Sequence, residues 1–186
     1  MDAWMYVVIG IVAVAAIVIA IAYAYKSSRR RALQERFGPE YDRAVDDADK
    51  RRHAERDLAG RADERDELDI RPLTPAARHR YADEWHDVQA RFVDAPSASV
   101  TEADALVTRV MRDRGYPVDD FESQYRLVSV DHPRIVENYR AAHDLYVQDR
   151  QGKAETEDLR NAVVYYRSLF DELLEEEETE QTGSRN

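Results

Sequence analysis

A run of uncharged residues near the N-terminus constrains the fold of this chain more than any other feature. It extends from Ala3 to Tyr25, which is 23 residues without a charged side chain. A helix needs roughly 20 residues to cross a hydrocarbon core about 30 Å thick. Inside lipid every amide must find its hydrogen-bond partner within its own segment, so a single isolated crossing has to be helical. The sequence therefore predicts a transmembrane helix over residues 1–25.

The residues that flank this run predict its orientation. Trp4 and Tyr6 lie near one end, and Tyr23 and Tyr25 near the other, where aromatic rings meet membrane interfaces. The cationic residues of this region all follow the run, and they are Lys26, Arg29, Arg30, Arg31 and Arg36. Because positive residues next to a membrane helix stay in the cytoplasm, we expect a single-pass protein of the cell (inner) membrane. Its N-terminus should be outside and its C-terminal domain cytoplasmic.

A cleaved signal peptide is the alternative to a retained anchor. Ala22, Tyr23 and Ala24 resemble a signal-peptidase site. A signal peptide carries positive charge ahead of a shorter apolar core, however, and here only Asp2 stands between the first residue and the run. Cleavage would make the mature chain a secreted helical protein.

Charge and composition limit the partners. The formal net charge of −11 argues against general binding of nucleic acid, whose phosphates favour basic surfaces. The absence of cysteine removes disulfides, thiolate nucleophiles and cysteine-based zinc sites. The basic cluster of Lys26, Arg29, Arg30 and Arg31 is the exception to the acidic character, and we expect it to lie against anionic lipid headgroups of the bilayer.

A stripe of small side chains marks one face of the apolar run. Ala16, Ala20 and Ala24 recur every four residues, as in motifs through which membrane helices associate. A homodimer through this stripe is therefore an alternative to a monomer, although alanine is also common in helices that do not associate.

The segment from 26 to 69 is expected to be a basic collar followed by a charged juxtamembrane helix or spacer. The first helix should continue to Arg36, because Gly38 and Pro39 then interrupt it and Pro39 suits the start of another helix. From Asp42 to Asp69 the charges are mixed and large apolar residues are few. That pattern favours a solvated polar spacer over a short coiled coil.

Residues 70–174 are predicted to form a small antiparallel bundle of four to five helices, so that the whole chain is all-α. Thr74 and Pro75 open the first of these helices, and residues 94–99 then break the chain. Thr101 with Asp104 resembles a capping box that opens the next helix, and another helix should start near Asp131. No segment alternates with a period of two, so strands are not expected. Residues 175–186 should be an acidic disordered tail. The apolar positions recur at helical spacing, and they are Ala77, Tyr81, Trp85, Val88, Phe92, Ala103, Val107, Val110, Met111, Phe121, Tyr125, Val128, Ile135, Tyr139, Ala142, Tyr146, Leu159, Val163, Tyr166, Phe170 and Leu173.

Motifs that carry chemistry are not found in the sequence. There is no glycine-rich nucleotide fingerprint, no phosphate-binding loop and no serine-hydrolase elbow. The five histidines do not recur at metal-ligand spacing. We therefore assign no catalytic, cofactor-binding or metal-binding residue and expect a non-enzymatic interaction or scaffold module with an unidentified protein partner. The alternative is an enzyme in which His86, beside Asp87, acts as a general base.

Aromatic residues on the predicted helices are the candidates for binding a protein partner. They are Tyr81, Trp85, Tyr139, Tyr146 and Tyr166. Tyrosine can fill a core while its hydroxyl reaches the edge, and this favours packing over a groove for a partner helix. A groove that binds a partner helix is the alternative.

Four short segments carry a resemblance to known sequences. They are RFGPEYDR (36–43), FVDAP (92–96), RGYP (114–117) and HPRIVENYRAAH (132–143). In these segments the chain resembles a group of uncharacterised bacterial proteins that join one N-terminal membrane segment to a small helical domain. The resemblance implies the same architecture, and it implies no activity, cofactor or catalytic residue.

Overall fold

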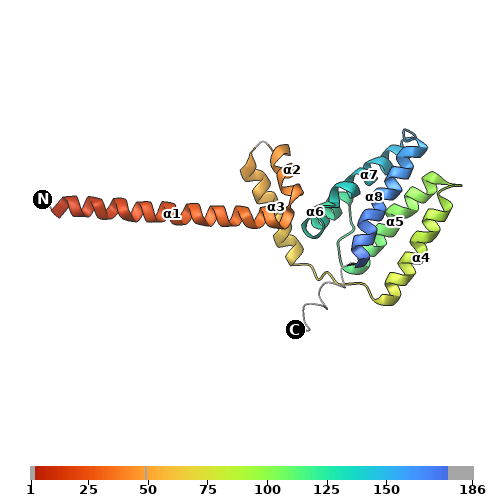
Figure 1. The fold of residues 1–186 in the computed structure, drawn as a ribbon, viewed down its shortest axis with the longest axis horizontal. Coiled ribbons are helices and arrows are strands. Elements are labelled where there is room, and N and C mark those ends of the chain that lie inside the picture. The colour runs from red at the N-terminus through yellow and green to blue at the C-terminus, as the bar shows by residue number, and fades with distance from the viewer. Residues whose placement is uncertain (1–2, 49, 176–186) are drawn as a thin grey trace. The chain divides into compact units, whose positions relative to one another are not determined.

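The computed structural model is helical throughout the part of the chain that it describes. That part comprises the backbone of residues 3–48 and 50–175, and the side chains of 16–21, 23–48 and 50–175. It contains eight helices and no strand (Figure 1), so the predicted all-α class is confirmed. The helices are α1 (Ala3–Phe37), α2 (Pro39–Asp47), α3 (Arg51–Asp66), α4 (Pro75–Arg91), α5 (Pro96–Arg114), α6 (Phe121–Asp131), α7 (Val136–Arg150) and α8 (Thr156–Glu175).

The chain forms two compact units. The first comprises Met1–Ala59 and the second Gly60–Asn186, so the division falls inside α3. The boundaries predicted after residues 25, 69 and 174 stay predictions. The predicted acidic tail coincides almost entirely with residues 176–186, which lie outside the described residues.

In the first unit, α1 is one unbroken helix from Ala3 to Phe37 (Figure 1). It ends as the sequence predicts, because Gly38 adopts a φ of 46°, a region that favours glycine, and Pro39 then starts α2. Leu33, Phe37 and Tyr41 are buried on α1 and α2, which pack together. The segment predicted to be a polar spacer also contains buried apolar residues. Solvent reaches little or nothing of Ala54, Leu58 and Ala59 in α3.

The predicted transmembrane helix lies only partly within the described side chains. Among the described residues, no helix combines the length and apolar character needed to cross a membrane. The side chains of residues 1–15 and 22 lie outside the description, and Trp4 and Tyr6 are among them. Ala16, Ala20 and Ala24 are described, and all three are exposed on α1. The membrane crossing stays a prediction.

In the second unit, helices α4 to α8 share one hydrophobic core. Helix α5 packs against α4, α7 and α8, while α7 also packs against α6 and α8. The predicted apolar positions supply most of this core, and its largest fully buried side chains are those of aromatic residues, leucines and Met111. Thr74 caps α4 as predicted, because its hydroxyl accepts a hydrogen bond from the Ala77 amide at 3.2 Å. The helical bundle is therefore confirmed.

Two predicted helix starts are wrong. Helix α5 begins at Pro96 rather than at Thr101, because proline suits the first turn and the preceding break is shorter than expected. Thr101 instead donates to the Ser97 carbonyl inside the helix. Asp131 ends α6 instead of starting the next helix, and α7 begins at Val136.

Candidate functional site: a basic pocket

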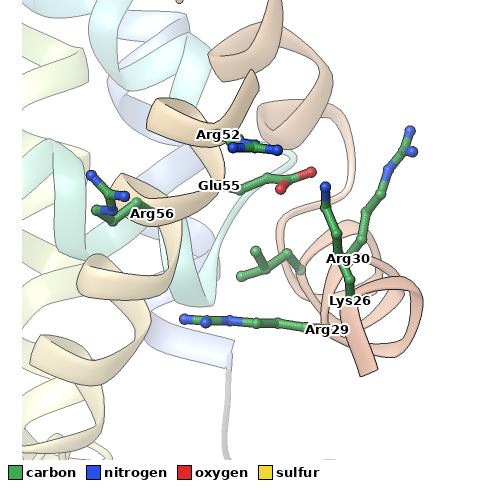
Figure 2. A pocket seen from close by; sticks show the side chains of 7 residues that line it. Lys26, Arg29, Arg30, Arg52, Glu55 and Arg56 are labelled. Carbon is green, nitrogen blue, oxygen red and sulfur yellow. The ribbon is translucent and has the colours of Figure 1, made fainter. Parts of the chain in front are cut away.

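A concave site lies in the first unit, between α1 and the first half of α3. Its volume is about 420 Å³. Five cationic side chains and one carboxylate line it, in addition to Leu33 (Figure 2), and they are Lys26, Arg29, Arg30, Arg52, Glu55 and Arg56. This concentration of positive charge contrasts with the formal net charge of −11 of the whole chain.

Helical spacing explains why these residues face one another. Lys26, Arg29 and Arg30 occupy positions i, i+3 and i+4 of α1, which lie on one face of a helix. Arg52, Glu55 and Arg56 repeat that spacing on α3. The face on α1 continues through Leu33, which is 8% exposed, so it passes from charged to apolar toward the end of the helix. The pocket therefore combines charged side chains with one buried apolar side chain, Leu33.

Glu55 is held by a tyrosine of α2. The Tyr41 hydroxyl donates to the Glu55 carboxylate at 2.9 Å, and Tyr41 itself is buried. Burial raises the pKa of Tyr41 above its ordinary value, the Glu55 carboxylate raises it further, and Arg30 opposes them. This bond joins α2 to α3 and fixes the one acidic group of the pocket in place.

Most of the cationic side chains of the pocket do not form an ion pair with a described residue. Within the described residues, Lys26, Arg29, Arg52 and Arg56 have no carboxylate at ion-pair distance. Arg29 extends from α1 toward α3 in Figure 2. Guanidinium groups arranged in this way match the oxygens of a phosphate, to which each can donate two hydrogen bonds.

The structure brings together three of the four basic residues that the sequence singled out. Lys26, Arg29 and Arg30 line the pocket, whereas Arg31 is exposed and lies outside it. Arg52 and Arg56 were not among the residues predicted from the sequence. Their four-residue spacing places both on one helical face, but the mixed charges around them gave no sign that this face would meet α1.

The aromatic residues proposed to bind a partner are mostly inside the second unit. Tyr81, Trp85, Tyr139 and Tyr166 are each at most 3% exposed, while Tyr146 is half-buried. Trp85 stacks on Phe170 with ring centroids 4.6 Å apart. This placement favours the packing alternative, and the partner groove stays a prediction.

The buried tyrosines use their hydroxyls within the unit. Tyr166 donates to Asp104 at 2.7 Å, and Tyr81 donates to Asp113 at 2.6 Å. Burial raises the pKa values of Tyr166 and Tyr81, and the neighbouring carboxylates raise them further, so both stay protonated at neutral pH. These hydroxyls thus act as structural hydrogen-bond donors.

The alternative catalytic pair is exposed. His86 and Asp87 both lie on the solvent-facing side of α4. Neither lines the basic pocket or a smaller hollow of about 170 Å³ formed by Gln89, Phe92, Arg160, Val163 and Val164. In the described part of the chain, no three histidine and acidic side chains are grouped so as to hold a metal ion.

Comparison with models of known protein families, with curated proteins and with solved structures found no match to this chain.

Proposed function

We propose that this protein is a single-pass membrane protein whose helical part is a non-enzymatic interaction module held at the cytoplasmic face of the bilayer. The observation that carries the proposal is the 23-residue uncharged run that leads directly into a basic cluster. A run of this length suits one crossing, and the cluster suits the cytoplasmic interface. Its partners in this proposal are the bilayer and a protein that has yet to be identified.

The continuity of α1 supports this proposal. The helix extends from Ala3 through the basic residues to Phe37 without a break, so the apolar run and the basic cluster belong to one helix. One helix that carries both holds the basic cluster at a fixed distance from the apolar run.

Cysteine labelling tests the anchor and its orientation. The chain has no native cysteine, so a single reporter can be placed at Asp2 or at Val93, which is 84% exposed. In intact spheroplasts a membrane-impermeant maleimide should label the Asp2→Cys chain, and it should label the Val93→Cys chain only after lysis. Labelling of Val93→Cys in intact spheroplasts, or release of the chain by alkaline carbonate, would contradict the proposal. A mature chain that begins near Tyr25 would establish the secreted alternative.

Proximity labelling from the C-terminus tests the interaction module. The full chain with a C-terminal labelling enzyme should mark a reproducible set of membrane-associated neighbours. The matched control is the labelling enzyme carried on an unrelated single-pass anchor. Identical sets from the two proteins, with no self-association of the chain, would argue against an interaction role.

A further inference from the structure

We infer that the basic pocket between α1 and α3 binds the phosphate of an anionic phospholipid headgroup. This inference deepens the proposed function and rests on it, because the pocket meets lipid only if the run from Ala3 to Tyr25 is in the bilayer. It replaces a diffuse attraction between a basic cluster and the membrane with a discrete site that holds one headgroup.

The position of the pocket along α1 selects lipid as the source of the phosphate. Lys26 follows the last residue of the uncharged run, and Arg30 lies four residues further, about 6 Å along the helix axis. The headgroup layer outside the hydrocarbon core is roughly 5–7 Å thick on each side. The wall formed by Lys26, Arg29 and Arg30 is therefore at headgroup depth when the run crosses the membrane.

The chemistry of the pocket selects a phosphate over other anions. Four of its five cations are arginines, whose planar guanidinium groups bind phosphate oxygens in pairs. The volume of about 420 Å³ is within the roughly 300–1,000 Å³ that small-ligand sites usually occupy. Nucleic acid is an unsuitable occupant because the chain as a whole carries a net charge of −11.

Two double variants separate a pocket from a diffuse basic surface. Arg29→Gln with Arg52→Gln removes one cation from each wall of the pocket. Arg31→Gln with Arg51→Gln removes the same charge from positions one or two residues away on the same two helices, and both of these residues are exposed and outside the pocket. A diffuse attraction depends on the number of charges, so it would weaken equally in the two variants.

Native mass spectrometry of the full chain provides the measurement. The chain is released from mixed micelles that contain equal amounts of phosphatidylglycerol and phosphatidylcholine. Wild type should retain one phosphatidylglycerol in preference to phosphatidylcholine. The preference should fall about tenfold or more in R29Q/R52Q, since each charge-assisted hydrogen bond contributes about this factor. It should stay within about twofold of wild type in R31Q/R51Q, which loses no pocket contact.

Three outcomes would overturn the inference. Wild type without a preference for phosphatidylglycerol would show that the pocket does not select an anionic headgroup. Equal losses in the two variants would show a diffuse surface. Displacement of the lipid by an excess of inorganic phosphate would assign the pocket to a free phosphate. Carbonate extraction of the same variants keeps this test separate from the proposed function, since a variant that loses the headgroup should stay in the membrane.

Discussion

At the scale of single residues, several interacting ionisable groups lie at the end of α6. Asp131 accepts from Arg65 at 2.7 Å and from the Tyr116 hydroxyl at 2.5 Å. The next residue, His132, is 2% exposed. Burial lowers the pKa of His132 to about 4, Arg114 and Arg65 also lower it, and Asp131 opposes them. The imidazole is therefore neutral at pH 7, and its contact with Glu172 at 3.9 Å is not an ion pair there.

The buried imidazole predicts a loss of stability in acid. Between pH 6.5 and about 4, the unfolded chain binds a proton at His132 that the folded chain does not, so the free energy of unfolding falls as pH falls. The contribution is about 3 kcal/mol at the lower limit. Unfolding of the full chain in mild detergent, followed by circular dichroism against pH, measures it. The His132→Gln variant should lack this part of the acid loss. If the free energy of unfolding fell equally with pH in the two proteins, the pKa of His132 would not be lowered in the folded chain.

At the scale of elements, the end of α5 fixes the segment that leads from α3 to α4. Gly115 ends the helix with a φ of 102°. The Arg71 amide donates to the Arg114 carbonyl at 2.8 Å, which brings the Asp69 backbone close to the glycine. A Cβ on residue 115 would lie 2.6 Å from the Asp69 carbonyl oxygen.

Alanine substitutions at three glycines should give a graded series of stabilities. Gly115→Ala combines a left-handed φ with a backbone clash, so it should cost more than about 2 kcal/mol. Gly152→Ala, at a φ of 67° with open space around it, should cost about 1 kcal/mol. Gly60→Ala lies inside α3 with nothing nearby and should stabilise the protein by about 0.5–1 kcal/mol. Denaturant midpoints of the three variants test this order, and equal losses at 115 and 152 would contradict the close approach to Asp69.

At the scale of the whole molecule, charge is distributed unevenly along the chain. The formal net charge is −11, yet three of the first four cationic residues after the apolar run line one pocket. In the proposed orientation these cations both retain the soluble part in the cytoplasm and bind the surface of the inner leaflet.

Moving positive charge from the C-terminal side of the apolar run to its N-terminal side should change the direction in which the run crosses the membrane. Replacement of Lys26, Arg29, Arg30 and Arg31 by glutamine, together with Asp2→Lys, places one positive charge before the run and leaves Arg36 as the first cationic residue after it. On the order of half of the molecules should then present a Val93→Cys reporter outside, because flanking lysine and arginine set the orientation. Maleimide labelling of spheroplasts measures the fraction. An orientation unchanged from wild type would show that another feature sets the topology.

Much of the fold was predictable because the second unit obeys helical periodicity. Tyr125, Tyr139, Tyr166 and Phe170 are buried as their spacing predicts. The start of α5 was missed because the proline at its first position was assigned to the preceding break. The pocket was only half predictable: adjacency to the apolar run marks Lys26 and Arg29, whereas Arg52 faces them through tertiary contacts that sequence spacing does not encode.

The absence of any break in α1 has a mechanical consequence. A continuous helix is torsionally stiff, since each residue is fixed at about 100° from the next. The wall that carries Lys26 and Arg29 therefore turns through the same angle as the residues from Ala3 to Tyr25. With that run in the bilayer, as proposed, a protein that binds and rotates α1 there would move Lys26 and Arg29 around the helix axis, because no break between Ala3 and Phe37 would absorb the rotation.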